Sequence, residues 1–358
     1  MSTIRVPSDL NDADALLAAD HDGLLRAVSM AGAQVRATAA AVDEGALDQL
    51  RTGDRPRSVI WVAGRGPAET AGAILAATLG GSAAEPIAIA PEVPPWIGPL
   101  DVLVVAGNDP GDPVLAAAVA TGVRRGARVV VAAPAEGPLR DAGAGRAAVL
   151  APRLPVPDEF ALSRYLAAGL ATLHAVDPTI RVDLAALADE LDHEALRNSA
   201  AREVFTNAAK TLAQRLSSGN VVLAGDSAAT LALARHLSAL LLRVGHKVVA
   251  AAGLPDALVA LRSGAGFGAG LSDVDALFHD EQIDGPLPDR LRILVLTLAA
   301  ERAALAARVE HFAEVEVVGA EDVPDAATDP VAVGSAEQQL ALLALRIEMA
   351  AVYLGLAE

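Results

Sequence analysis

The 358-residue chain contains no cysteine, and that absence excludes disulfides, thiolate metal sites and thiol nucleophiles. Aromatic residues make up only 3% of the sequence, and lysine occurs only at Lys210 and Lys247. No apolar run of about 18 residues is free of charges and turn-forming residues, so we predict no membrane span. The first twenty residues lack the basic, apolar and small-residue order of a signal peptide, and we expect a cytoplasmic protein.

Positive charge is also scarce. The chain has 28 Lys and Arg residues against 45 Asp and Glu residues, which gives a formal net charge of −17. No basic cluster is present to neutralise phosphates, and such neutralisation supplies much of the affinity of nucleic-acid binding. We therefore expect neither nucleic acid nor an anionic membrane as a partner.

Apolar residues are abundant, at 53% of the sequence, and this excludes intrinsic disorder. The first fifty residues have helical spacing of apolar positions, and residues 51–56 are rich in turn formers. Short β-branched runs then alternate with alanine-rich helical stretches. The pattern predicts strands at 58–63, 86–90, 100–106, 127–132 and 147–150, and helices at 70–79, 114–125 and 160–174.

The same alternation returns in the second half of the chain. It predicts helices at 198–216, 228–243, 299–309 and 336–356, and strands at 220–224, 247–251, 290–296 and 315–318. Strands alternating with helices are typical of βαβ units around a buried parallel sheet. A glycine-rich stretch at 263–270 is interpreted as a loop.

We therefore predict an α/β protein with two tandem doubly wound parallel sheets. The expected organisation is an N-terminal helical segment at 1–54, a first α/β domain at 55–178, a linker at 179–197, a second α/β domain at 198–335 and a C-terminal helix at 336–358.

Three short segments resemble a known family. Val93–Asp101 is similar to the segment that leads into the phosphate-loop strand of the bifunctional phosphoglucose/phosphomannose isomerases, which have two sugar-isomerase (SIS) domains. Asn207–Lys210 and Ala351–Leu354 also match that family, and its TobH-like actinobacterial-type branch is the most similar. The resemblance implies aldose–ketose chemistry on hexose 6-phosphates, a place in mannose metabolism and a homodimer.

The phosphate-binding residues that the resemblance implies are altered. Where the family has Gly-x-Gly-Gly-Ser, this chain has Gly64-Arg65-Gly66-Pro67-Ala68, and proline has no N–H to donate. Where the family has Ser-x-Ser-Gly-x-Thr, the chain reads Gly107-Asn108-Asp109-Pro110-Gly111-Asp112. Two carboxylates replace the hydroxyls, and like charges at about 4 Å repel by several kcal/mol at an effective dielectric near 20.

The proton-transfer residues of the family are not matched either. The stretch aligned with its Glu-Asn-x-Lys motif, Leu242–Lys247, has no carboxylate, and Val259 stands near the position of its histidine. Its late lysine would fall beyond Glu358. We assign no catalytic residue on this basis.

The candidate substrate-binding residues follow three predicted strands: Gly64, Arg65 and Gly66; Asn108, Asp109, Gly111 and Asp112; and Asp226 and Ser227. A tight turn or an anion cradle fits the first group, and Arg65 would supply a charge-assisted contact. Helix capping is favoured for Asp112 and Ser227, with phosphate binding as the alternative for Ser227 and contact with a cationic or neutral sugar group as an alternative for the loop at 108–112. A divalent ion at Asp109 and Asp112 is a weaker alternative. We predict no metal and no cofactor, since the glycine pattern of a dinucleotide site is incomplete.

The leading hypothesis is a non-catalytic, carbohydrate-derivative-binding protein that senses a sugar phosphate or regulates a sugar-metabolism enzyme. The first alternative is an active isomerase, in which Arg65 or Arg243 binds phosphate and His246, Asp256 or Glu203 transfers the proton. The second alternative is an oligomerisation partner without a ligand, in which the helices at 231–242 and 340–353 pack in a dimer.

Overall fold

The computed structural model describes residues 9–217, 219–263, 291–324 and 334–357. Of the loop expected at 263–270, only Ser263 belongs to the described residues. The helices are α1 (Ala13–Ala19), α2 (Leu24–Val28), α3 (Ala31–Asp43), α4 (Pro67–Leu79), α5 (Pro113–Arg124), α6 (Gly137–Gly143), α7 (Leu162–Val176), α8 (Leu184–Arg197), α9 (Ala208–Ser217), α10 (Ala228–Arg243), α11 (Leu254–Ser263), α14 (Ala299–Val309) and α15 (Ala336–Ala357). The strands are β1 (Ser58–Ala63), β2 (Ile87–Ala90), β3 (Asp101–Ala106), β4 (Arg128–Ala132), β5 (Ala148–Val149), β6 (Asn220–Gly225), β7 (Ala250–Gly253), β8 (Leu291–Leu296) and β9 (Val315–Val318).

The chain folds into two compact units. The five-stranded unit comprises Asp20–Ser199 and Gly334–Met349, and the four-stranded unit comprises Met1–Ala19, Ala200–Val333 and Ala350–Glu358. Helix α15 therefore contributes residues to both units. The segment expected as a linker at 179–197 contains α8, which belongs to the five-stranded unit. The expected boundaries themselves stay predictions.

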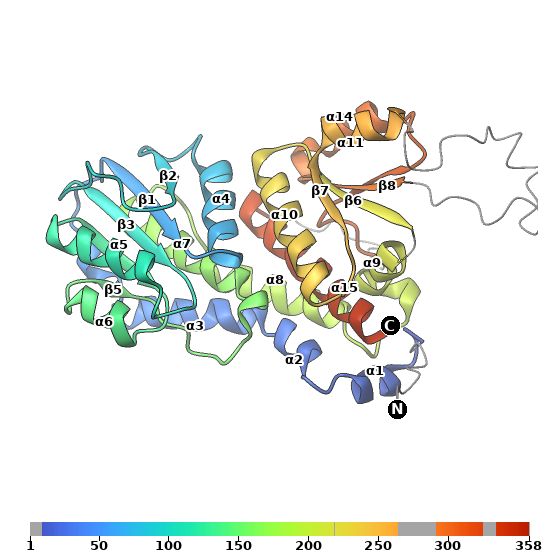
Figure 1. Ribbon diagram of the computed structural model, residues 1–358, viewed down its shortest axis with the longest axis horizontal. Helices are drawn as coiled ribbons and strands as arrows, with labels where there is room; N and C mark the ends of the chain where they lie inside the picture. Colours follow the sequence, from blue (N-terminus) through green and yellow to red (C-terminus); the bar gives the residue numbers. More distant parts are fainter. Residues whose placement is uncertain (1–8, 218, 264–290, 325–333, 358) are drawn as a thin grey trace, which may run out of the picture. The chain divides into compact units, whose positions relative to one another are not determined.

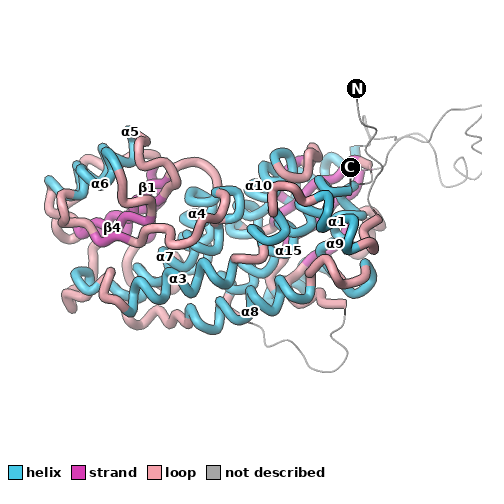
Figure 2. The backbone as a smooth tube through the Cα atoms, turned by 90° about the horizontal axis from the view of Figure 1, so that it is seen from below, coloured by secondary structure: helices cyan, strands magenta, loops and turns pink. Residues whose placement is uncertain are grey.

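The five-stranded unit is built on a parallel sheet with the order β2-β1-β3-β4-β5 (Figure 1). After their first residues, Ser58 and Asp101, strands β1 and β3 are entirely apolar, as expected where helices cover both faces of a parallel sheet. One face packs on α5 and α6 through a core that includes Ile60, Leu103 and Val119. On the other side of the sheet, α7 packs on α4 and α3, and α3 also packs on α8 (Figure 2).

Two glycines allow helices to approach Trp61 on β1. A Cβ atom on Gly72 of α4 would lie 2.4 Å from the Trp61 ring, and one on Gly169 of α7 would lie 3.0 Å from it. The Trp61 indole N–H donates to the Ala68 carbonyl at 3.0 Å. The close packing of α4 therefore fixes the position of its N-terminus beside the end of β1.

The four-stranded unit is built on a second parallel sheet, with the order β7-β6-β8-β9. Val222 and Ile293 on one face pack with Leu254 of α11 and Leu305 of α14. Helix α10 packs against β6 and β7. The prediction of two doubly wound parallel sheets is confirmed.

Two predicted elements begin at least three residues later than expected. The helix predicted from residue 198 begins at Ala208, because the Asn207 side chain accepts the Lys210 N–H at 2.9 Å and so caps a helix at that point. The strand predicted at 247–251 begins at Ala250. His246 has a left-handed backbone (φ 50°) and the Lys247 N–H bonds to the Leu241 carbonyl, so these residues form the end of α10 rather than a strand.

The two helices expected to mediate oligomerisation are largely buried within the chain. Every residue from Leu340 to Leu354 of α15 is buried, and α10 buries Leu233, Leu237 and Leu240 completely. The buried faces cannot pack in a dimer, but α10 has an exposed face that includes Leu242, so a dimer through these helices stays a prediction. Helix α15 is also long and apolar enough to span a membrane by length and composition, but 83% of its most apolar window is buried inside the protein.

Candidate functional site

The carboxyl edge of each sheet, where its parallel strands end, is the expected position of a ligand-binding site. In open α/β sheets, ligands bind at the point where the strand order reverses. In the five-stranded unit that point lies between β1 and β3, and in the four-stranded unit it lies between β6 and β8.

The structure brings the first two groups of predicted residues together. The loop after β1 and the loop after β3 are joined by a hydrogen bond from the Gly64 N–H to the Ala106 carbonyl at 2.8 Å. A Cβ atom on Gly64 would lie 3.7 Å from the Gly107 Cα atom. Gly64, Arg65 and Gly66 therefore lie beside the loop at 107–112.

The turn after β1 needs glycine at one position. Gly66 has φ 87° and ψ −135°, a conformation that L side chains rarely adopt, and it precedes Pro67 at the first position of α4. No side chain of the described residues caps α4. Arg65 is exposed, and its guanidinium has no hydrogen-bond or ion-pair partner within the described part of the chain. Arg65 is thus the cation open to a ligand in this turn.

The carboxylates of the loop after β3 bond to the loop's own backbone. The Asp109 carboxylate accepts the Gly111 N–H at 2.8 Å. The Asp112 carboxylate accepts the Val114 N–H at 2.8 Å and the Leu115 N–H at 3.3 Å, so it caps α5 as the sequence predicted. An incoming phosphate would have to displace these bonds and would meet two negative charges.

Among the residues that the structure describes, no group of three or more His, Asp or Glu side chains could hold a metal ion. Asp109 and Asp112 are both engaged with backbone N–H groups, and their arrangement gives no support to the divalent-ion alternative. Asn108 is exposed at the same loop. As ligand-binding residues, the members of this edge stay predictions.

At the edge of the four-stranded unit, Asp226 and Ser227 follow β6. Ser227 and Thr230 form a capping box at the start of α10, so the predicted capping role of Ser227 is confirmed. The Asp226 carboxylate forms an ion pair with Arg308 of α14 at 2.6 Å. Both side chains therefore have structural partners at this edge.

Sequence reasoning missed Glu301, which lies in the first turn of α14 directly after β8. Burial raises the pKa of the half-buried Glu301 carboxyl, and the charge of Asp226 raises it further. The neighbouring Arg302 pairs with Glu321 at 3.0 Å and with Asp322 at 2.8 Å. The sequence could have indicated Glu301, because it is a glutamate in the first turn of the helix that follows the strand at the reversal point.

The groups named for the isomerase alternative are not gathered in one place. Arg243 and His246 precede β7, at the amino edge of the sheet, whereas Asp256 follows β7 in the first turn of α11. Glu203 is exposed before the short 3₁₀ turn at Val204–Thr206. His246 and Asp256 therefore lie at opposite edges of the same sheet.

No family model and no curated protein matches the chain. Solved structures do match it over nearly its whole length. Tagatose-6-phosphate ketose/aldose isomerase from Escherichia coli is 13% identical with a TM-score of 0.57, covering 98% of this chain and 96% of that chain. The C-terminal domain of glucosamine-fructose-6-phosphate aminotransferase from Francisella tularensis is 10% identical with a TM-score of 0.61, covering 94% and 98%.

A hypothetical protein from Thermus thermophilus is 15% identical with a TM-score of 0.63, covering 97% of this chain and 89% of that chain. At these identities the likeness shows the fold alone. The chain has the fold of the SIS-domain phosphosugar isomerases, in two successive α/β units.

Proposed function

We propose that this chain is a non-catalytic SIS-fold protein that binds a carbohydrate derivative, and that it senses a sugar phosphate or regulates a sugar-metabolism enzyme. One observation carries the proposal. Asp109 and Asp112 occupy the backbone N–H groups of the loop after β3 and of the first turn of α5. A helix N-terminus with free N–H groups is the usual phosphate cradle of such folds.

The ligand would then bind in a different pose from that of an isomerase substrate. Arg65 would contact its anionic group, since its guanidinium is exposed and without a partner among the described residues. Asn108 and the backbone of the glycines at 64 and 66 would contact sugar hydroxyls. Membership of the TobH-like phosphoglucose/phosphomannose isomerase branch, a role in mannose metabolism, a cytoplasmic location and a homodimer belong to this proposal.

Proton NMR with fructose 6-phosphate or mannose 6-phosphate in heavy water tests the proposal. Saturation transfer reports contact with the ligand, and interconversion with exchange of the C2 proton reports catalysis. We expect contact without interconversion. Turnover that scales with the protein and survives removal of host isomerase would overturn the non-catalytic assignment, and absence of contact would overturn sugar-phosphate sensing.

A matched pair of variants locates the binding site. Arg65→Gln should weaken contact with fructose 6-phosphate by about tenfold, because a charge-assisted contact is lost. Arg146→Gln is the control, since Arg146 is also exposed and also lacks a side-chain partner among the described residues. Equal binding by the two variants would remove Arg65 from the site.

A second candidate function, an active isomerase, is favoured by Glu301. This half-buried carboxyl lies at the reversal point of the four-stranded unit, and burial together with the Asp226 charge raises its pKa, which favours a proton-transfer role over a permanently ionised one. If interconversion is found, Glu301→Gln should abolish it. Glu310→Gln, at the exposed far end of α14, should leave it unchanged.

A further inference from the structure

The five-stranded unit contains a cavity of about 180 Å³ away from its carboxyl edge. Leu79, the last residue of α4, lines it, whereas the turn at Gly66 lies at the start of the same helix. A 13-residue helix is about 20 Å long, so this cavity and the carboxyl-edge loops are separate places. Its walls come from α4, α7, the segment before α8, and the starts of α8 and α15.

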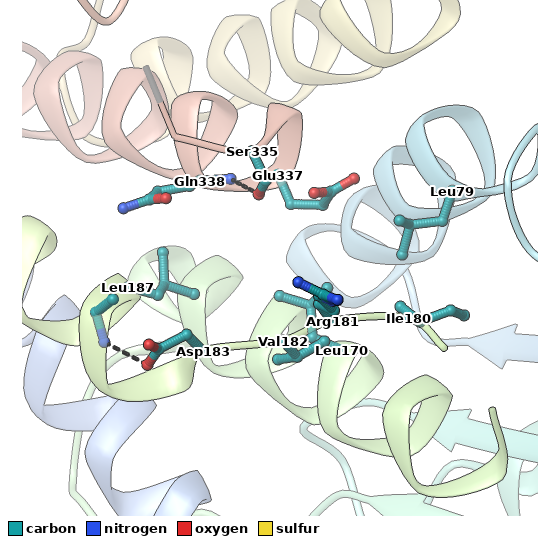
Figure 3. Close-up of a pocket in the computed structure, with 11 residues that line it drawn as sticks. Leu79, Leu170, Ile180, Arg181, Val182, Asp183, Leu187, Ser335, Glu337 and Gln338 are labelled. Carbon is teal, nitrogen blue, oxygen red and sulfur yellow. Dashed lines mark hydrogen bonds between the residues drawn. The ribbon is translucent and has the colours of Figure 1, made fainter. Parts of the chain in front are cut away.

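The cavity has an apolar part and a polar part. Leu79, Leu170, Ile180 and Leu187 supply apolar surface. Figure 3 shows Glu337 and Gln338 above the cavity, on α15, and Arg181 below it. A small site with apolar walls and a few placed polar groups is the usual form of a metabolite pocket.

Most polar groups at the cavity already have a structural task. The Asp183 carboxylate accepts the Ala186 N–H at 2.9 Å and caps α8. The Ser335 hydroxyl accepts the Gln338 N–H at 3.3 Å at the start of α15. These two side chains stabilise the helix ends that form the walls.

Glu337 and Arg181 form no such stabilising bond with the described residues. Glu337 is only 6% exposed, yet its carboxylate has no hydrogen-bond or ion-pair partner in the part of the chain that the structure describes. Because Glu337 lines the cavity, a ligand that donates to its carboxylate would add a charge-assisted hydrogen bond that no described residue supplies. The Arg181 guanidinium, which is exposed, is likewise without a partner among those residues.

We propose that this cavity binds a small zwitterion of the size of an aliphatic amino acid. The ligand's ammonium group bonds to the Glu337 carboxylate, and its carboxylate bonds to the Arg181 guanidinium. Its aliphatic side chain packs against the leucine and isoleucine wall. This site is independent of the carbohydrate site proposed above.

Calorimetric titration of the full chain with L-leucine and with L-valine tests the proposal. Glu337→Gln and Arg181→Gln should each weaken binding of the better probe by about tenfold or more, because each removes one charge-assisted bond. Glu337→Gln keeps the size of the side chain, and Arg181→Gln keeps a polar but shorter one. Arg146→Gln serves as the matched control and should bind like the unmodified chain.

Three further probes separate the contributions of the two charges. Isoamylamine lacks the carboxylate and 4-methylpentanoate lacks the ammonium group, so both should bind at least about tenfold more weakly than L-leucine. D-Glucose should not compete. The proposal is overturned if neither amino acid binds, if the amine alone binds as tightly as the amino acid, or if glucose competes. Equal binding by all three variants would also overturn it.

Discussion

The two units differ in where they place their charges. In the five-stranded unit, Glu194 and Arg346 are each about 1% exposed and form an ion pair inside the protein at 2.6 Å. In the four-stranded unit, the buried Lys210 has no carboxylate within ion-pair distance among the described residues and donates to the carbonyls of Ala200 and Arg202 at 2.8 and 2.7 Å. Its ammonium group also lies over the Tyr353 ring, 5.4 Å from the centroid.

The carboxyl edges show the opposite distribution. In the five-stranded unit, the carboxylates of Asp109 and Asp112 bond to neutral backbone N–H groups. In the four-stranded unit, Asp226 pairs with Arg308, and Glu301 lies within reach of its charge. Two units of the same fold thus use the carboxylates at their edges differently: in one unit they stabilise a loop, and in the other they belong to an electrostatic cluster.

Removing the buried cation of each unit should have the largest effect. Arg346→Met leaves the Glu194 carboxylate buried with only Arg197 as an ion-pair partner among the described residues, and should lower the free energy of unfolding by about 3–5 kcal/mol. Lys210→Met leaves two carbonyls without donors and should cost about 1–3 kcal/mol. Urea denaturation of the two variants measures both. An equal loss in the free energy of unfolding would mean that the ion pair in one unit and the lysine–carbonyl bonds in the other contribute equally to stability.

Removing the cap at the corresponding helix of each edge should have a smaller effect. Asp112→Ala and Ser227→Ala each leave first-turn N–H groups of α5 or α10 without their acceptor, and each should cost about 1 kcal/mol. Chemical denaturation provides the measurement. If Asp112→Ala is neutral in stability while phosphate binding improves, Asp112 serves to exclude phosphate rather than to cap α5.

Glu85 tests whether the interior charges of the five-stranded unit are fully compensated. It is 3% exposed, and neither of its carboxylate oxygens has a hydrogen-bond partner among the described residues. Burial raises the pKa of this carboxyl, and the nearby Asp177 charge raises it further. The folded state therefore holds the proton more tightly than the unfolded state.

A carboxyl with a raised folded-state pKa favours the folded state at pH values below its unfolded pKa, and this contribution is lost as the pH rises through the folded pKa. The Glu85→Gln chain should thus be more stable than the unmodified chain at pH 7, and the difference should shrink toward pH 4. Thermal melts across this pH range measure it. A difference independent of pH would show that folding does not change the pKa of Glu85.

The smallest expected change is a shift in the pKa of Glu301 at the edge of the four-stranded unit. Asp226→Asn removes the negative charge that helps to raise the pKa of Glu301, and it leaves Arg308 without this ion pair. The pKa of the Glu301 carboxyl should fall toward its ordinary value. Carbon-13 NMR titration of the glutamate carboxyl signals follows this change, with Asp256→Asn as the control. An unchanged pKa would show that burial alone raises it.

Much of the fold could be predicted from the sequence. The apolar strands at 58–63 and 315–318 and the helices at 228–243 and 299–309 have the predicted bounds, because their periodicity and flanking turns are local properties. The caps at Asp112 and Ser227 were predictable for the same reason. The start of α9 was not, since Asn207 had to be recognised as its cap within a longer helical pattern.

The alternation of strands and helices, the class of two parallel sheets and the caps at Asp112 and Ser227 could therefore be predicted from the sequence alone. Only the tertiary structure decided which side chains meet. The pairing of Asp226 with Arg308, the position of Glu301 beside them and the cavity between Arg181 and Glu337 join residues that are distant in the chain. Such contacts depend on strand order and helix packing, which periodicity does not encode.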